Sequence, residues 1–184
     1  MIHWYVGITG SGKTTKAVAD LAEDIEANKR PALVIDSQGV KLLAKIKHVN
    51  SWQAAARRVW GEGKNAAFIP SSPEEVEALF AIARDLGNTN ILLDEAAFWM
   101  TSRSIARPIE LAFRTHLHTG LTIRATTQAM DTIAPVAMQC STSIKIFRCN
   151  SLRILERLKQ EFGVKPEEVE RLERGVFLEK GSGF

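Results

Sequence analysis

One eight-residue segment near the start of the chain constrains its fold more than any other feature. Residues 7–14, GITGSGKT, match the pattern G-x-x-x-x-G-K-[S/T], with Lys13 and Thr14 in the two final positions. The segment follows a short β-rich run, Ile2–Val6, and precedes a stretch whose apolar residues recur at helical spacing. A strand, a glycine loop and a helix in this order are typical of a loop that binds the phosphates of a nucleotide.

The chemistry of such a loop assigns roles to its residues. Glycines let the backbone wrap closely around phosphate, so that N–H groups and the helix N-terminus face the negative oxygens. Lys13 then reaches the β and γ phosphates of ATP, and Thr14 supplies a hydroxyl to Mg²⁺. The alternative, a glycine-rich turn that happens to contain lysine, does not explain the flanking strand and helix. The residues expected to contact ATP are Thr9, Gly10, Ser11, Gly12, Lys13, Thr14 and Thr15.

Polar side chains also follow two later strands. Asp94 and Glu95 come directly after the apolar run Ile91–Leu93, so a buried strand delivers both carboxylates to the sheet edge that carries the glycine loop. We expect Asp94 to hold the Mg²⁺ shell and Glu95 to polarise the water that attacks the γ phosphate. Gln128 ends the next strand, where its amide could contact both the γ phosphate and this water. The alternative for Asp94 and Glu95 is a pair of solvated acids at a helix start. The alternative for Gln128 is a turn residue that forms a hydrogen bond with its own backbone.

Buried strands alternate with helical segments along the chain, which predicts an α/β fold with a mainly parallel sheet. With the glycine loop, this predicts a three-layer α/β/α P-loop NTPase of the RecA-like (ASCE) type. The expected strands, besides the first, are Pro31–Asp36, Ala66–Pro70, Asn90–Glu95, Leu121–Gln128, Ser141–Phe147 and Gly175–Glu179. The expected helices are Thr15–Lys29, Val40–Trp60 with a break at His48–Ser51, Ser71–Leu86, one that starts near Ile105 to Ile109, Leu152–Phe162 and Pro166–Glu173.

Length and composition favour a single domain. The chain has 184 residues, 45% of them hydrophobic, which is enough apolar material for one core. We expect an ATPase core over residues 1–150, with the helices and return strand of residues 151–184 packed on it. No apolar run approaches the roughly 18 residues of a membrane span, and the first strand runs straight into the glycine loop. These features predict a cytoplasmic protein without a membrane span or signal peptide, and Cys140 and Cys149 as neutral thiols.

Charge is unevenly distributed along the chain. Residues 101–159 contain nine Lys or Arg against three Asp or Glu, which is +6, and the remainder is 15 minus 18, or −3. Such a segment can form a face that contacts a polyanion, but ordinary solvated helix faces explain it equally well.

Three segments together carry a resemblance to a known group of proteins. GITGSGKT, ILLDEA and FRTHLHTGLTIRATTQAMDTIA resemble the HerA/FtsK superfamily of DNA-pumping ATPases, which includes viral genome-packaging ATPases and Zot-like filamentous-phage assembly ATPases. The resemblance spans most of the chain. It implies a homo-oligomeric ring, a pentamer or a hexamer, with ATP sites between subunits, double-stranded DNA in the channel and a capsid or portal-vertex protein as a partner.

One position departs from that pattern. Relatives often place arginine directly before the second histidine of the basic segment, where this chain has Leu117. The arginine that reaches a neighbour's γ phosphate is therefore sought among Arg114, Arg103 and Arg107. For each of them the alternative is a surface charge or a contact with DNA phosphate.

The resulting functional hypothesis is an ATP-hydrolysing DNA translocase, a genome-packaging motor in the host cytoplasm and associated with the virion. Two alternative functions would use the same nucleotide site, namely a filamentous-phage assembly ATPase and a nucleotide-dependent switch. A small-molecule or nucleotide kinase, which would use Asp36, is the alternative from another class. The Asp94–Glu95 pair followed by Gln128 fits attack by water better than transfer of phosphate to a metabolite.

Overall fold

The computed structural model describes residues 1–184 apart from residues 38, 40–45, 102–103 and 182–184. Over the described residues, eight strands form one sheet in the order β10-β9-β1-β8-β5-β2-β4-β3. All neighbours in this sheet pair in parallel except β10, which is antiparallel to β9. Its strands are β1 (Ile2–Val6), β2 (Ala32–Ile35), β3 (His48–Val49), β4 (Ala66–Phe68), β5 (Asn90–Leu93), β8 (Thr122–Thr127), β9 (Ser143–Phe147) and β10 (Phe177–Gly181). A separate two-stranded hairpin consists of β6 (Met100–Thr101) and β7 (Ser104–Ile105).

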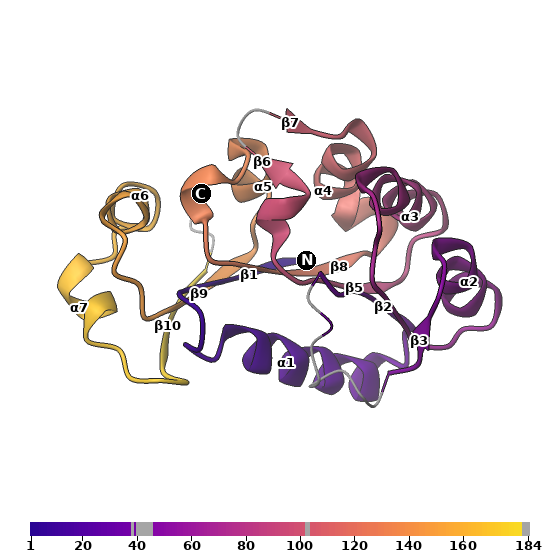
Figure 1. Ribbon diagram of the computed structural model, residues 1–184, viewed down its shortest axis with the longest axis horizontal. Helices are drawn as coiled ribbons and strands as arrows, with labels where there is room; N and C mark the ends of the chain where they lie inside the picture. Colours follow the sequence, from indigo (N-terminus) through magenta and orange to yellow (C-terminus); the bar gives the residue numbers. More distant parts are fainter. Residues whose placement is uncertain (38, 40–45, 102–103, 182–184) are drawn as a thin grey trace.

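Helices cover both faces of the sheet, which gives the three layers that the sequence predicts (Figure 1). One face carries α1, the opposite face carries α3, α4 and α5, and α6 and α7 lie beyond the β9–β10 end of the sheet. The helices are α1 (Lys13–Asn28), α2 (Trp52–Ala56), α3 (Pro73–Leu86), α4 (Arg107–Thr119), α5 (Pro135–Gln139), α6 (Leu152–Phe162) and α7 (Pro166–Glu170). Shorter turns are η2 (Arg57–Gly61, π-helical), η3 (Ala96–Phe98) and η4 (Met130–Thr132).

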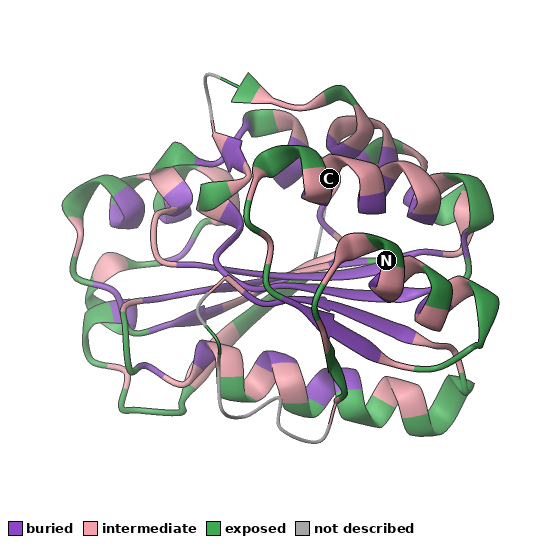
Figure 2. Ribbon diagram, turned by 45° about the vertical axis from the view of Figure 1, so that its right-hand side comes forward, coloured by how far each residue is buried: buried purple, intermediate pink, exposed green. Residues whose placement is uncertain are grey.

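Alternate residues of each strand belong to two apolar clusters, one on each face of the sheet. Tyr5 and Leu92 pack with Leu21 of α1, whereas Trp4 packs on the other face, with its ring centroid 6.3 Å from that of Phe113. The central strands are therefore buried throughout, and the outward faces of the helices are exposed (Figure 2). Because both faces of the sheet are covered, the ends of its strands are left for function.

The predicted fold class is confirmed, and one predicted helix is wrong in part. Within the predicted helix Val40–Trp60, residues 40–45 lie outside the described residues. His48–Val49, where a break was expected, forms β3, and the helix begins only at Trp52. The backbone of β3, the edge strand, gains hydrogen bonds to β4, which a helix at this position would forgo.

Two elements have no counterpart in the sequence predictions. They are α5, which has five residues, and the hairpin β6–β7, which has two residues in each strand. Elements this short contain too few residues to show a hydrophobic period. Over the part of the chain that the structure describes, no helix has both the length and the apolar character to cross a membrane.

Candidate active site

The glycine loop lies between β1 and α1, at the carboxyl edge of the sheet. Backbone hydrogen bonds join Gly7 N to the Thr127 carbonyl oxygen (3.2 Å) and Ile8 N to the Arg148 carbonyl oxygen (3.1 Å). A Cβ at Gly7 would lie 2.7 Å from Phe147 Cβ, so a side chain has no space there. The ends of β8 and β9 therefore hold the start of the loop in place.

The end of the loop forms the N-terminus of α1. Gly12, in the left-handed region with φ of 102°, is the N-cap and makes no side-chain capping bond. The first turn of this 16-residue helix contains no acidic residue, so its N–H groups and dipole favour an anion. Lys13, also in this turn, is only 7% exposed. Burial lowers the pKa of Lys13, while the nearby carboxylates of Glu95 and Asp94 act to raise it.

A turn from the C-terminal segment contacts the same loop, which sequence reasoning missed. Gly175 N donates to the Ser11 carbonyl oxygen at 2.9 Å. The turn is closed by Val176 N, which donates to the Glu173 carbonyl oxygen at 3.1 Å, and Gly175 has φ of +84°. A positive φ at the third position of a β-turn requires glycine or asparagine. Gly175 itself was therefore the sequence signal that could have predicted this turn.

Asp94 and Thr14 lie together, as the sequence predicts. Asp94 Oδ1 accepts hydrogen bonds from Thr14 Oγ1 (3.2 Å) and Thr126 Oγ1 (2.8 Å). Burial raises the pKa of Asp94, against the effect of these two hydroxyl groups. A hydroxyl and a carboxylate oxygen fit Mg²⁺, which takes few protein ligands and keeps water and phosphate oxygens for the rest. Consistently, the described residues contain no cluster of three or more His, Cys, Asp or Glu suited to a metal.

Glu95 is held in a strained conformation by the end of β8. Its φ is 51°, in the left-handed region, where a non-glycine residue is uncommon and often functional. Its backbone N donates to Thr126 Oγ1 at 2.9 Å. Its Oε1 accepts from Thr127 Oγ1 (3.1 Å) and from Gln128 N (3.0 Å). The carboxylate therefore has a fixed position near the glycine loop.

Gln128 also contacts the glycine loop directly. Thr9 Oγ1 donates to Gln128 Oε1 at 2.5 Å, which links the middle of the loop to the end of β8. The structure thus brings Gln128 together with both the loop and Glu95, as its position at a strand end predicts.

Two further side chains lie at this edge, of which the sequence identified only Asp36, as the residue that a kinase would use. Ser37 Oγ donates to the Asp94 carbonyl oxygen at 2.5 Å and accepts from Trp99 Nε1 at 3.3 Å. Asp36, buried at the end of β2, is one of the charges that raise the pKa of Asp94. Ser37 was not identified, although it directly follows the predicted strand Pro31–Asp36 at the edge that carries the site.

Two of the candidate arginines, Arg107 and Arg114, belong to α4 and take no part in the hydrogen bonds given above. Arg114 lies on α4 with its side chain 55% exposed, and its Nε bonds Glu110 Oε1 at 2.8 Å. Arg107 is the first residue of α4, and Arg103 lies outside the described residues. His116 is buried beside the Phe113 carbonyl oxygen, and burial lowers its pKa.

Comparison with known proteins identifies the family. The model of the zonular occludens toxin (Zot) family matches residues 1–180. The chain belongs to the Zot family. This confirms the resemblance to Zot-like ATPases that the sequence motifs indicate. A search of curated protein sequences gave no significant match.

Solved structures share the fold of this Zot-family chain. The genome packaging NTPase B204 from Sulfolobus turreted icosahedral virus 2, in complex with ATP-gammaS, superposes with a TM-score of 0.81 at 18% identity, over 98% of this chain and 91% of that chain. The bacterial conjugative coupling protein TrwB gives 0.72 at 10% identity, over 98% and 82%. VirB4 of Thermoanaerobacter pseudethanolicus gives 0.67 at 9% identity, over 99% and 87%. These similarities confirm a P-loop NTPase fold.

Proposed function

We propose that this Zot-family protein is a Mg²⁺-dependent ATPase that moves double-stranded DNA, a genome-packaging motor that acts as a homo-oligomeric ring. The observation that carries the proposal is the Glu95 carboxylate, fixed by Thr127 and Gln128 beside a complete phosphate loop. Support for the biological role comes from B204, a genome packaging NTPase with the same fold. Such a role implies a capsid or portal-vertex protein as a partner and the host cytoplasm as the location.

The proposal gives each residue of the site a task. Backbone N–H groups of residues 9–15, together with Lys13, bind and orient the phosphates. Thr14 and Asp94 would hold Mg²⁺, which neutralises charge on the transferred phosphoryl group. Glu95 orients the attacking water and accepts its proton, and the Gln128 amide contacts this water and the γ phosphate.

The family match favours a second candidate, a filamentous-phage assembly ATPase. It would hydrolyse ATP with the same residues, so the two candidates differ in the partner that stimulates turnover. The proposed motor is stimulated by double-stranded DNA, whereas an assembly ATPase without DNA transport is not.

Steady-state ATP hydrolysis, with and without double-stranded DNA and over a range of protein concentrations, tests the proposal. We expect Lys13→Ala to abolish turnover and Glu95→Gln to bind ATP but hydrolyse it at least about 100-fold more slowly. Wild-type rates from Glu95→Gln would remove Glu95 from the mechanism. Turnover that ignores DNA but rises with a nucleoside or metabolite would instead identify a kinase.

A further inference from the structure

An open hollow lies at the edge of the sheet opposite the candidate active site. Its volume is about 480 Å³, and it is bordered by the C-terminal end of α1, residues 46–47 and the turn at residues 63–65. Pro31 and Asn65, which line it, directly precede β2 and β4, so the hollow is at the amino ends of these strands. Five of its lining residues are basic, namely Lys29, Arg30, Lys47, Arg58 and Lys64, against one acid, Glu26.

Two of these cations are fixed by backbone contacts. Arg30 Nη1 donates to the Gly120 carbonyl oxygen, and Arg58 Nε donates to the Asn65 carbonyl oxygen, both at 2.8 Å. Both arginines are partly buried. Their guanidinium groups are therefore positioned before any ligand arrives, which lowers the entropic cost of binding one.

The lysines around them are exposed, and their charge is only partly offset. Lys64 Nζ lies 3.3 Å from Glu62, which is also 3.8 Å from Arg58. Among the described residues, Lys29 and Lys47 form no ion pair. Five basic residues against Glu26 and Glu62 leave 5 minus 2, or +3, around this hollow.

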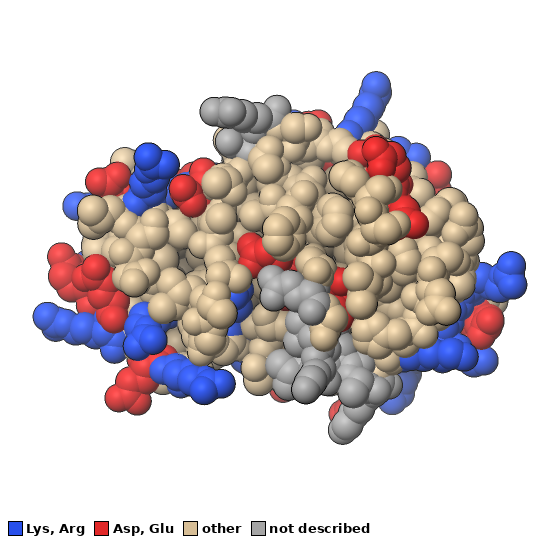
Figure 3. All heavy atoms as spheres, in the orientation of Figure 1, with Lys and Arg blue, Asp and Glu red and all other residues tan. Residues whose placement is uncertain are grey.

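Part of the basic charge elsewhere in the chain is neutralised by ion pairs. In the segment 101–159, where the sequence places the largest basic excess, Arg114, Arg124, Lys145 and Arg157 each pair with an acid. Ion pairs within the chain therefore neutralise part of that basic excess, whereas the basic charge at the hollow faces solvent. In Figure 3, Lys and Arg side chains appear on the end of the molecule that carries α2 and β3.

We propose that this hollow binds the phosphate backbone of double-stranded DNA. The inference deepens the proposed function, on which it rests, by naming a surface that contacts the transported DNA. Arg30 and Arg58 present planar, pre-positioned donors suited to a phosphate, and the flexible lysines at the rim reach neighbouring phosphates. Contacts of this kind read no base sequence, as transport along any sequence requires.

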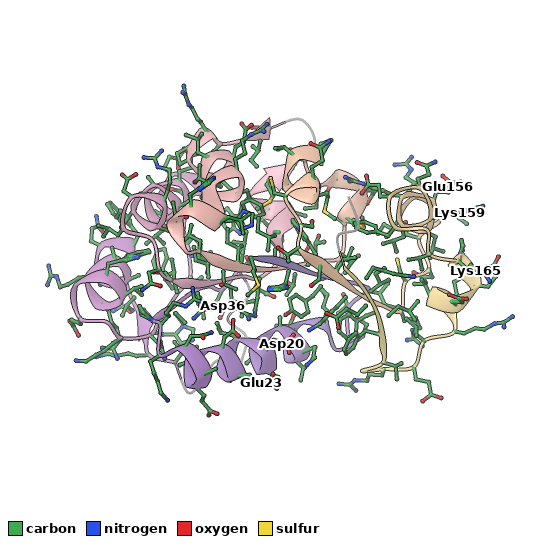
Figure 4. The ribbon with its side chains drawn as sticks, turned by 180° about the vertical axis from the view of Figure 1, so that it is seen from behind. Asp20, Glu23, Asp36, Glu156, Lys159 and Lys165 are labelled. Atoms are coloured by element: carbon green, nitrogen blue, oxygen red, sulfur yellow. The ribbon has the colours of Figure 1, made fainter. Side chains whose placement is uncertain are left out.

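Fluorescence anisotropy with labelled double-stranded DNA, measured over a series of salt concentrations, tests this site. The variant is Lys29→Gln with Lys47→Gln. The matched control is Lys159→Gln with Lys165→Gln, which removes the same charge from the α6–α7 end of the molecule (Figure 4). We expect the hollow variant to bind DNA roughly tenfold more weakly, with a salt dependence shallower by about two phosphate contacts. The control should bind as the wild type does, and ATP hydrolysis without DNA should be unchanged in both variants.

Each other outcome overturns the proposal in a recognisable way. Equal losses in both variants would attribute the effect to net charge alone. DNA binding that neither variant weakens would place the DNA elsewhere and leave the proposed motor intact. Wild-type protein that binds no DNA at all would remove both this site and DNA transport. Binding of inorganic pyrophosphate to the wild type but not to the hollow variant, with the same DNA affinity in both, would identify a site for a small anion.

Discussion

Thr126 joins the two carboxylates of the candidate site. Its hydroxyl donates to Asp94 Oδ1 and accepts from Glu95 N, so one buried side chain controls the position of both acids. We expect Thr126→Val, which keeps the shape and loses the hydroxyl, to lower kcat for ATP at least about tenfold. Steady-state kinetics measure this, and Thr126→Ser should restore most of the rate. Thr122→Val, on the same strand at its other end, is the control that should leave kcat unchanged.

Asp20 predicts a pH dependence of stability. It accepts hydrogen bonds from Tyr5, Lys16 and Lys145, under the sheet on α1 (Figure 4). Burial acts to raise the pKa of Asp20, but the hydrogen bonds from Lys145, Lys16 and Tyr5 outweigh it and lower the pKa to about 2. Because this value is below that of the unfolded chain, the stabilisation is complete above about pH 4 and is lost as pH falls toward 2.

The measurement is the free energy of unfolding of Asp20→Asn between neutral pH and about pH 2. We expect a loss of about 2 kcal/mol at neutral pH, and a difference from the wild type that shrinks between about pH 4 and pH 2. Glu156→Gln, on the exposed face of α6, should change stability by less than about 0.5 kcal/mol. A difference that stays constant down to pH 2 would contradict the role of this carboxylate.

The candidate-site residues that could be predicted from the sequence are those that belong to a local pattern in the chain. Lys13 and Thr14 follow from a motif, and Asp94 and Glu95 follow from their place after an apolar strand. Thr126 could not be assigned in this way. Its contact with the acids depends on the register between β5 and β8, in which Leu93 pairs with Ala125, and no local pattern encodes that register.

At the scale of elements, the turn of residues 173–176 sets the geometry of the phosphate loop. In a trans peptide the C=O and N–H groups point in opposite directions, so the bond from Gly175 N to the Ser11 oxygen directs Gly12 N away from the turn. A Cβ at Gly12 would lie 3.1 Å from Gly175 Cα, so the two backbones are in close contact. We therefore predict that the C-terminal segment is coupled to nucleotide binding.

Gly175→Ala tests this coupling. Its new Cβ would meet no atom within 4 Å, but φ of +84° is strained for alanine, so the turn should rearrange and release Ser11. We expect the Kd for ATP to rise several-fold, measured by isothermal titration calorimetry. Gly163→Ala, at the end of α6, has φ of +62° and equal space, and is the control for strain. Both variants should lose about 1 kcal/mol of stability, and equal ATP affinities would exclude the coupling.

Elements with a clear apolar pattern were predictable, and elements that depend on tertiary pairing were not. The strand Ile2–Val6 and the helix Leu152–Phe162 have the predicted bounds, because each shows a clear apolar pattern between recognisable ends. The two-residue strand β3 exists only through its pairing with β4, and α5 has a single turn. Tertiary contacts, rather than local preference, decide the structure of such segments.

At the scale of the whole molecule, the two proposed sites lie at opposite edges of the sheet. The carboxyl ends of β1, β5 and β8 carry the candidate ATPase residues, and the amino ends of β2 and β4 carry the basic hollow. The sequence predicted the first edge because parallel strands place their ligands there. It did not predict the hollow, whose residues come from three separate segments that meet only in the folded chain.

The proposed ring makes a further prediction, which concerns the sharing of ATP sites between subunits. Glu95→Gln removes the proposed catalytic carboxylate, whereas Arg114→Ala removes an exposed arginine that would act on a neighbour's site. If both variants are inactive alone, a mixture of them should regain hydrolysis. At some interfaces an intact Glu95 of one subunit then meets an intact Arg114 of the next.

The mixture is assayed at a protein concentration that saturates the wild-type rate. Arg107→Ala and Arg103→Ala, mixed with Glu95→Gln in the same way, identify which arginine acts between subunits. Recovery with one arginine variant and none with the other two would assign it. Two results together would contradict the ring model. Glu95→Gln would lower wild-type activity only in proportion to its fraction, and no mixture would regain hydrolysis. Each subunit would then hydrolyse ATP independently.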